Sequence, residues 1–173
     1  MRTLTYSVAA SLDGYIAGSE GQVDWLFTDD DYGLTAFLET IDTVLIGQAT
    51  YDFMVGQGFP SYPGLRNVVF SRTLRAEDHP EIEVVSGDPA PFVRALKQEA
   101  GAGIWLVGGG VVFRYLLDAH LVDEVVVAVH PILLGGGIPL LPRRDGMTDL
   151  RLREVVPYDT GLVSLSYQVL QPA

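Results

Sequence analysis

Alternation of apolar and polar positions predicts strands at both ends of the chain. Residues 4–8 alternate in this way, which is typical of a half-buried strand near the N-terminus. Residues 163–169 alternate likewise after a turn at 159–161, and this pattern favours an antiparallel hairpin at the end of a sheet. Residues 125–129 are apolar at every position, which indicates a strand covered on both faces.

Short apolar runs predict further buried strands in the middle of the chain, with helices between them. The runs cover residues 43–46, 67–70, 82–85 and 104–107, and residues 15–17 form a short extended piece. Helices are expected around residues 34–38, from an N-cap at Thr50, from Pro91 to Ala100, and over residues 111–117. Strands that alternate with helices predict an α/β fold: a three-layer, mostly parallel twisted sheet with an antiparallel C-terminal strand. We expect a single domain spanning residues 1–173.

Composition and charge limit the classes of ligand and partner that the chain is expected to bind. The chain is 48% hydrophobic and 19% charged, which favours a packed globule over a disordered chain. It contains no cysteine, and its three histidines are scattered, so we expect no disulfide and no metal site. The formal net charge of -11 makes nucleic acid a poor candidate partner. An anionic ligand would need backbone N–H groups and local cations.

The sequence shows neither a targeting segment nor a membrane span. The N-terminal residues lack the continuous apolar stretch of a signal peptide. The most apolar stretch, residues 125–141, is interrupted by His130, Pro131 and three glycines, so it does not have the form of a membrane span. We therefore expect no membrane partner and a cytoplasmic location.

Two glycine-containing junctions between a strand and a helix are candidate phosphate sites. Gly108, Gly109 and Gly110 follow one predicted strand, and Gly47-Gln48-Ala49-Thr50 follows another. Such junctions present unpaired backbone N–H groups at the positive end of a helix dipole. Each has a plainer interpretation: close packing of strand and helix for the three glycines, and an N-cap for Thr50. Two junctions in one sheet favour a shared dinucleotide site.

A third strand end adds a candidate cation. Ser71 and Arg72 follow the strand at residues 67–70, and a guanidinium is suited to bidentate phosphate recognition. The alternative is an ordinary solvated surface arginine. The chain has neither the Gly-x-Gly-x-x-Gly fingerprint nor a Walker-type loop, so the Rossmann and P-loop classes are excluded.

Six motifs occur in an order that resembles a known family. They are Ser11-Leu12-Asp13-Gly14-Tyr15-Ile16-Ala17, Val23-Asp24-Trp25, Asp31-Tyr32-Gly33, Gly47-Gln48-Ala49-Thr50-Tyr51, Gly108-Gly109-Gly110 and Pro131-Ile132-Leu133-Leu134-Gly135. This order resembles the dihydrofolate-reductase-like superfamily, and in particular its bacterial branch related to the C-terminal reductase domain of riboflavin biosynthesis. The resemblance extends from Thr3 to Leu170. It implies a twisted, mainly parallel sheet and NADPH as the cofactor.

The resemblance also implies roles for particular residues. Ala9 and Ile16 would border the nicotinamide, and residues 14–25 would form a mobile loop over it. The residues expected at the phosphates and the adenosine end are Gly47, Gln48, Ala49, Thr50, Ser71, Arg72, Gly108, Gly109, Gly110, Val111 and Val112. The family usually has Arg at the position of Gln48, where it contacts the ribose phosphate, so the choice between NADPH and NADH rests on whether Arg72 substitutes. The riboflavin reductases usually have Glu at the position of Gly108, which argues against the riboflavin-pathway substrate.

The expected activity is NADPH-dependent reduction of a small heterocyclic substrate, pterin-like or pyrimidine-like. In this scheme Trp25 closes over the reactants, and either Asp30 or Asp31 orients or protonates a ring nitrogen. The alternative for these acids is a solvated, dipole-favoured start of the helix that follows. Asp13 is expected to serve only its own turn.

The resemblance further implies an assembly and leaves two other classes open. In relatives of the riboflavin branch the region corresponding to residues 131–139 contributes to dimer contacts, so a homodimer is expected. One alternative is a dinucleotide-binding protein that retains the fold without turnover. The other is an interaction module, which would leave the glycine and Ser-Arg strand ends unexplained.

Overall fold

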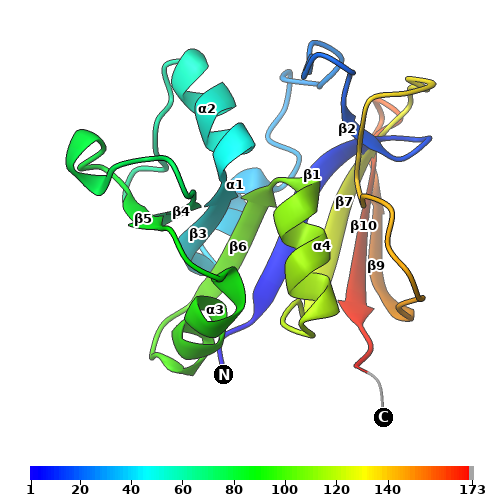
Figure 1. Ribbon diagram of the computed structural model, residues 1–173. Coiled ribbons are helices and arrows are strands. Elements are labelled where there is room, and N and C mark those ends of the chain that lie inside the picture. The colour runs from blue at the N-terminus through cyan, green and yellow to red at the C-terminus, as the bar shows by residue number, and fades with distance from the viewer. Residues whose placement is uncertain (172–173) are drawn as a thin grey trace.

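The computed structural model describes residues 1–171 and consists of one large sheet, a small two-stranded ribbon and flanking helices (Figure 1). The strands are β1 Leu4–Ser11, β2 Tyr15–Ala17, β3 Ile41–Gly47, β4 Arg66–Phe70, β5 Glu83–Val85, β6 Gly103–Gly108, β7 Glu124–His130, β8 Ile138–Pro139, β9 Leu150–Pro157 and β10 Val163–Val169. The helices are α1 Leu34–Leu38, α2 Gln48–Gly56, α3 Pro89–Gln98 and α4 Gly110–Asp118, with a 3-10 turn at Ala76–Asp78.

The large sheet has eight strands in the order β5-β4-β3-β6-β1-β7-β10-β9. The strands from β5 to β7 pair in parallel, whereas β10 is antiparallel to both β7 and β9. The predicted α/β class, with a mostly parallel sheet and an antiparallel C-terminal strand, is therefore confirmed. The partner strand of the predicted C-terminal hairpin is β9, whose register with β10 shifts between Ser166 and Tyr167.

Two apolar clusters hold the layers together, one on each face of the sheet. The larger cluster joins β1, β6 and β7 to α3 and α4 through residues such as Leu4, Leu106 and Leu116, each with no exposed surface. The smaller cluster joins β3 and β6 to α2 through Tyr51 and Met54, with α1 packed at its margin. Figure 1 shows α3 and α4 in front of the sheet and α1 behind it. Burial on both faces explains the continuous apolar runs in the central strands.

Three local expectations differ from the structure. Thr50 does not cap α2: the helix begins at Gln48, and Gly47, with extended backbone, occupies the N-cap position without a side-chain bond. Helix α3 begins at Pro89 rather than Pro91, because the Asp88 carboxylate accepts a hydrogen bond from the Ala90 N–H. The acids expected at the start of α1 precede its first turn, and Asp31 reaches it by accepting the Thr35 N–H.

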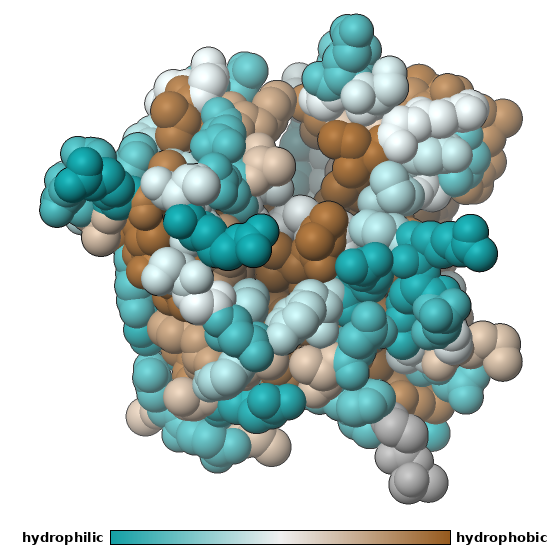
Figure 2. All heavy atoms as spheres, in the orientation of Figure 1, coloured by the Kyte–Doolittle hydropathy of each residue, from teal (hydrophilic) through white to brown (hydrophobic). Residues whose placement is uncertain are grey.

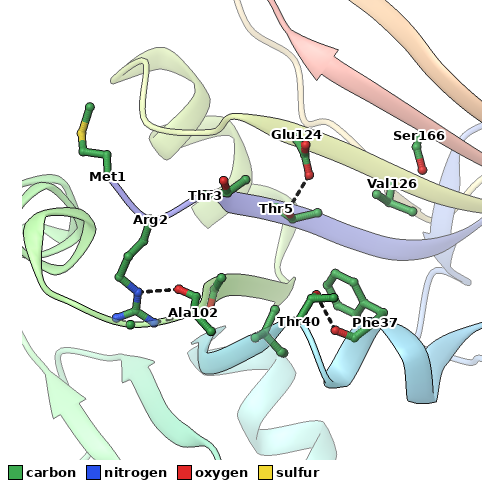
Figure 3. Close-up of a pocket in the computed structure, with 13 residues that line it drawn as sticks. Met1, Arg2, Thr3, Thr5, Phe37, Thr40, Ala102, Glu124, Val126 and Ser166 are labelled. Carbon is green, nitrogen blue, oxygen red and sulfur yellow. Dashed lines mark hydrogen bonds between the residues drawn. The ribbon is translucent and has the colours of Figure 1, made fainter.

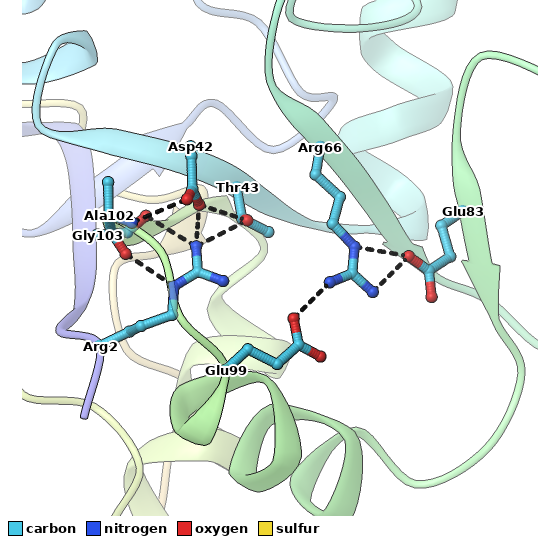
Figure 4. Close-up of polar contacts among 8 residues, drawn as sticks. All are labelled: Arg2, Asp42, Thr43, Arg66, Glu83, Glu99, Ala102 and Gly103. Atoms are coloured by element: carbon cyan, nitrogen blue, oxygen red, sulfur yellow. Dashed lines mark hydrogen bonds and ion pairs between the residues drawn. The ribbon is translucent and has the colours of Figure 1, made fainter.

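Charged side chains form ion pairs and hydrogen bonds at the amino-terminal edge of the sheet (Figure 4). The guanidinium of Arg2, which is buried, forms an ion pair with Asp42 and donates to the Thr43 hydroxyl and the Ala102 carbonyl. Burial would raise the pKa of Asp42, but hydrogen bonds from Thr43 and Ala102 and the charge of Arg2 together lower it. This network connects the first residues of the chain to β3 and to the turn before β6.

A hollow of about 600 Å³ lies at the same amino-terminal edge. Figure 3 shows it between α1, represented by Phe37, and the strand residues Thr5, Glu124, Val126 and Ser166. The glycine junctions follow the opposite ends of the strands. The hollow is therefore separate from the predicted ligand edge.

Candidate functional site

The carboxyl ends of the parallel strands lie along one edge of the sheet, and the predicted site residues follow them. β1, β3, β4, β6 and β7 end at Ser11, Gly47, Phe70, Gly108 and His130, respectively. Ligands of open α/β sheets bind at this edge. Figure 2 shows the surface hollowed there, between α2 and the side of the molecule that carries β2. The edge is therefore the candidate binding site.

The two glycine junctions contact each other at the centre of this edge. Ile46 pairs with Gly108 across a register shift between β3 and β6. A Cβ placed on Gly108 would lie 3.1 Å from the Thr50 hydroxyl oxygen, and one on Gly109 would lie 3.7 Å from the Gly47 Cα. A Cβ on Gly47 would lie 3.1 Å from a methyl group of Val112. The structure thus brings five of the predicted cofactor residues into one cradle, which we call the glycine cradle: Gly47, Thr50, Gly108, Gly109 and Val112.

Helix α4 begins at the glycine cradle. Gly109, its N-cap residue, has φ 93° and ψ 88°, a conformation that glycine adopts readily and other residues do not. The first N–H groups of a helix have no partner within it, so the positive end of the α4 dipole faces the cradle. Val111, in the first turn, is 65% exposed. This is the local structure that binds phosphate in other proteins.

Gly110 has a packing role that the sequence did not indicate. A Cβ at this position would lie 2.9 Å from both the Pro139 carbonyl oxygen and the Pro142 ring. Only glycine allows the segment around Pro139–Pro142 to pack this closely on α4. The third glycine of the motif is therefore explained by contact between α4 and this segment.

Gln48 and the loop after β4 form a polar network beside the cradle. The Gln48 amide oxygen accepts a hydrogen bond from the Ser71 hydroxyl at 2.8 Å, and its amide nitrogen donates to Thr73 at 2.8 Å. Ser71 is buried and also accepts the N–H groups of Thr73 and Leu74. The network fixes the loop that carries Arg72. Arg72 is exposed and has no ion pair or side-chain hydrogen bond within residues 1–171, and Ala49 is exposed on α2.

Ala9 and Ile16 lie on the other side of the edge. Ala9 is half-buried on β1 opposite Ala128 of β7. Ile16 lies on β2 and packs against the larger apolar cluster. β2 pairs with β8, and Ala17 is opposite Ile138. The two residues expected beside the nicotinamide therefore come from strands separated by the turn at Leu12–Gly14.

Trp25 lies against the end of β7. Its indole ring meets the His130 ring edge-on, with centroids 5.2 Å apart. Its indole nitrogen is buried, and it is the one buried side-chain polar atom in residues 1–171 without a hydrogen-bond partner. An unpaired buried donor costs free energy unless a ligand or water accepts from it. Trp25 therefore presents a donor that the fold itself leaves unused.

His130 and Phe27 complete this corner, and the sequence did not predict their contact. His130 is buried, and its Nε2 accepts the Phe27 N–H at 3.2 Å while its Nδ1 is 3.1 Å from the Ala128 carbonyl oxygen. Because the Phe27 N–H can only donate, the proton of the neutral ring lies on Nδ1. The position of His130 at a strand end is a signal of a pocket residue. Its partner, Phe27, lies on a loop 103 residues earlier in the chain, so the sequence does not indicate their contact.

The acids before α1 are exposed and engaged locally. The Asp31 carboxylate accepts hydrogen bonds from the Thr35 N–H at 3.0 Å and the Thr35 hydroxyl at 2.8 Å, so it satisfies the start of α1. Asp29 accepts from the Tyr32 hydroxyl at 2.7 Å. The carboxylate of Asp30 accepts only the Asp31 N–H among the described residues. Asp30 is thus the least engaged of the three.

Comparison with known proteins agrees with this geometry. An eight-stranded, mostly parallel sheet of this order with a glycine cradle at its carboxyl edge has the dihydrofolate-reductase-like fold. The chain belongs to the RibD C-terminal domain family, whose model matches residues 2–164. The resemblance to the superfamily and to its riboflavin-biosynthesis branch is therefore confirmed.

Individual relatives match along nearly their whole length. The uncharacterized protein YyaP of Bacillus subtilis (strain 168) is 32% identical over 179 aligned positions, which cover 96% of this chain and 94% of YyaP. The crystal structure of a putative riboflavin biosynthesis protein from Shewanella sp. PV-4 is similar with a TM-score of 0.85 and 25% identity, covering 99% of this chain and 100% of that one. Dihydrofolate reductase from Enterococcus faecalis, complexed with NADP(H), has the same fold at a TM-score of 0.68 and 22% identity, covering 96% and 94%.

Within residues 1–171, none of the four helices has both the length and the apolar character that crossing a bilayer requires. No group of three or more His, Asp or Glu side chains in these residues is arranged to hold a metal ion.

Proposed function

We propose that this chain is a single-domain, NADPH-dependent oxidoreductase that reduces a small pterin-like or pyrimidine-like heterocycle by hydride transfer. The glycine cradle carries the proposal, because it joins two strand ends and a helix N-terminus on one edge, with the exposed Arg72 on the neighbouring loop. The likeness to a dihydrofolate reductase complexed with NADP(H) supports the choice of cofactor.

The residues at the cradle fit a dinucleotide. Glycines at 108 and 109 let Thr50 and Gly47 pack closely against the start of α4, and a pyrophosphate would lie at the first N–H groups of this helix. The Thr50 hydroxyl, which does not cap α2, would donate to a phosphate. Arg72 would hold the ribose phosphate that distinguishes NADPH from NADH. When bound, the reduced nicotinamide supplies the hydride.

The substrate end lies beside Trp25. Its indole N–H is buried in this conformation; uncovered on substrate binding, it would donate to a carbonyl or ring nitrogen of the heterocycle, and the ring would exclude water from the reacting atoms. Asp30, rather than Asp31, is the acid we propose to orient or protonate the substrate, because Thr35 already engages the Asp31 carboxylate. Ala9 leaves room for a flat ring over β1.

Turnover tests this proposal. Purified protein and NADPH should show loss of reduced-nicotinamide absorbance with at least one oxidised pterin or aminopyrimidine. A Trp25→Phe variant keeps the aromatic ring but loses the donor. We expect its kcat/KM to fall roughly two- to tenfold, since one hydrogen bond to a bound ligand contributes about 0.5–1.5 kcal/mol. Unchanged kcat/KM in this variant would contradict the proposed role of the indole N–H.

A non-catalytic dinucleotide-binding protein is the second candidate. The exposed position of Asp29, Asp30 and Asp31 favours it, since general acids usually lie in a site from which water is excluded. This candidate predicts NADPH binding with no oxidation by any compound of the panel. Single-turnover reduction of one compound would exclude it.

We also propose that the protein forms a homodimer through the loop at residues 131–139. Leu133 and Leu12 are 69% and 67% exposed, and a backbone hydrogen bond from Leu12 to Ile132 holds their segments together. Figure 2 shows apolar surface at the corner beside β2. Exposed apolar patches commonly mark interfaces.

Light scattering after size exclusion should give twice the chain mass, and a Leu133→Asp variant should give the mass of one chain. A wild-type protein of one chain mass at micromolar concentration would contradict the dimer.

A further inference from the structure

Asp13 does more than form its own turn. Its carboxylate accepts the Ser11 hydroxyl at 2.7 Å, the Leu134 N–H at 3.0 Å and the Gly135 N–H at 2.7 Å. The Ser11 hydroxyl in turn accepts the Tyr15 N–H at 3.0 Å. One exposed side chain therefore connects the loop after β1 with the loop after β7, across more than a hundred residues of sequence.

Backbone contacts extend this connection on both sides. The Leu12 N–H donates to the Ile132 carbonyl at 2.9 Å, and the Leu140 N–H donates to the Gly14 carbonyl at 2.8 Å. Gly137 approaches β2 so closely that a Cβ on it would lie 2.2 Å from the Ala17 carbonyl oxygen. The segments 12–17 and 132–140 thus form one unit, which we call the clasp.

The clasp forms one side of the candidate site. It contains Ile16, expected beside the nicotinamide, and it begins where β1 and β7 end, next to Ala9 and His130. The resemblance implies a mobile loop over residues 14–25. In the structure residues 14–17 of this segment are held by the clasp, whereas residues 19–25 have no backbone hydrogen bond with the loop after β7.

We propose that Asp13 is a positioning residue: its carboxylate fixes the clasp and thereby sets the place of the nicotinamide end of the cofactor. This inference rests on the proposed function, because it assigns a role within the same site.

The charge of the carboxylate is central to this role. The Ser11 hydroxyl and the Leu134 N–H lower the pKa of Asp13, so the carboxylate is ionised at neutral pH and accepts all three hydrogen bonds. Asparagine has almost the same shape, but its amide NH₂ group cannot accept. In an Asp13→Asn variant at least one donor of the clasp therefore loses its partner.

Binding of whole and truncated cofactor tests the proposal. The truncated ligand is the adenosine bisphosphate fragment of NADPH, which contains the ribose phosphate but no nicotinamide. We expect Asp13→Asn to bind NADPH about tenfold more weakly, the size expected from losing one charge-assisted hydrogen bond, and to bind the fragment as the wild type does. Asp145→Asn, an exposed carboxylate on the loop before β9, should change neither affinity. Unchanged NADPH affinity in Asp13→Asn, or an equal loss for both ligands, would overturn the positioning role.

A second measurement distinguishes failure of the clasp from failure of the proposed cofactor binding. If the wild type binds neither ligand, the function fails, and the clasp is tested by NMR alone. The amide protons of Leu134 and Gly135 should shift upfield in Asp13→Asn and stay in place in Asp145→Asn, because only the first change removes their charged acceptor. Amide shifts that do not move in Asp13→Asn would overturn the clasp itself.

Discussion

A Gly109→Ala variant is expected to lose NADPH affinity by at least about tenfold. Gly109 holds φ 93° and ψ 88°, a region in which a residue with a Cβ is strained by about 1–3 kcal/mol. Relief of this strain would rotate the peptide groups on either side and move the first N–H groups of α4. The added methyl group would also lie 3.7 Å from both Gly47 and the Thr50 hydroxyl, inside the glycine cradle.

A matched control separates loss of binding from loss of stability. Gly146, on the loop before β9, also has a positive φ, 85°, and a Cβ on it would have no atom of residues 1–171 within 4 Å. Gly146→Ala should lower the free energy of unfolding by a comparable amount and leave NADPH affinity unchanged. Fluorescence titration and denaturant unfolding of both variants measure the two effects. Equal affinity of Gly109→Ala and wild type would show that the cradle does not bind the pyrophosphate.

An Arg72→Ala variant is expected to lose the preference for NADPH over NADH. Arg72 directly follows Ser71 of the Gln48 network, and the chain as a whole carries a net charge of -11, so little else attracts the extra phosphate. Charge-assisted hydrogen bonds contribute about 1.5–3 kcal/mol, which corresponds to a roughly ten- to hundredfold loss of NADPH affinity. Affinity for NADH, which lacks this phosphate, should stay the same.

Arg75→Ala is the control for this prediction. Arg75 lies on the same loop, but its guanidinium is engaged in an ion pair with Glu77 at 2.5 Å. Its removal changes the net charge by the same amount and should leave the ratio of the two affinities close to the wild-type value. If both variants reduce NADPH binding equally, the effect of Arg72 is one of overall charge and not of a contact.

Much of the fold could be predicted from the sequence, because burial on both faces leaves a direct pattern. The apolar runs at residues 43–46, 104–107 and 125–129 are all strands of the large sheet. The glycines at 47, 108 and 109 marked the strand ends that meet in the cradle. Boundaries were less accurate at α2 and α3: Gly47 and Asp88 cap the helices, whereas Thr50, the expected cap, and Pro91, the expected first residue, lie inside them.

The parts of the site built from long-range polar contacts could not be predicted. Asp13 has the local sequence of an ordinary turn, and nothing near it in the sequence indicates that Leu134 and Gly135 donate to its carboxylate. Nor does the sequence show that His130 accepts the Phe27 N–H, or that Gly110 is required by Pro139 and Pro142. Each of these depends on how loops pack, and loops carry no hydrophobic period from which contacts can be inferred.

Calorimetric titration of the wild-type protein with NADPH, and separately with NADH, tests the central claim most directly. We predict one NADPH per chain bound with micromolar affinity, and NADH bound at least about tenfold more weakly because it lacks the phosphate that Arg72 would contact. Absence of binding for both dinucleotides would contradict the account of the carboxyl edge as a cofactor site.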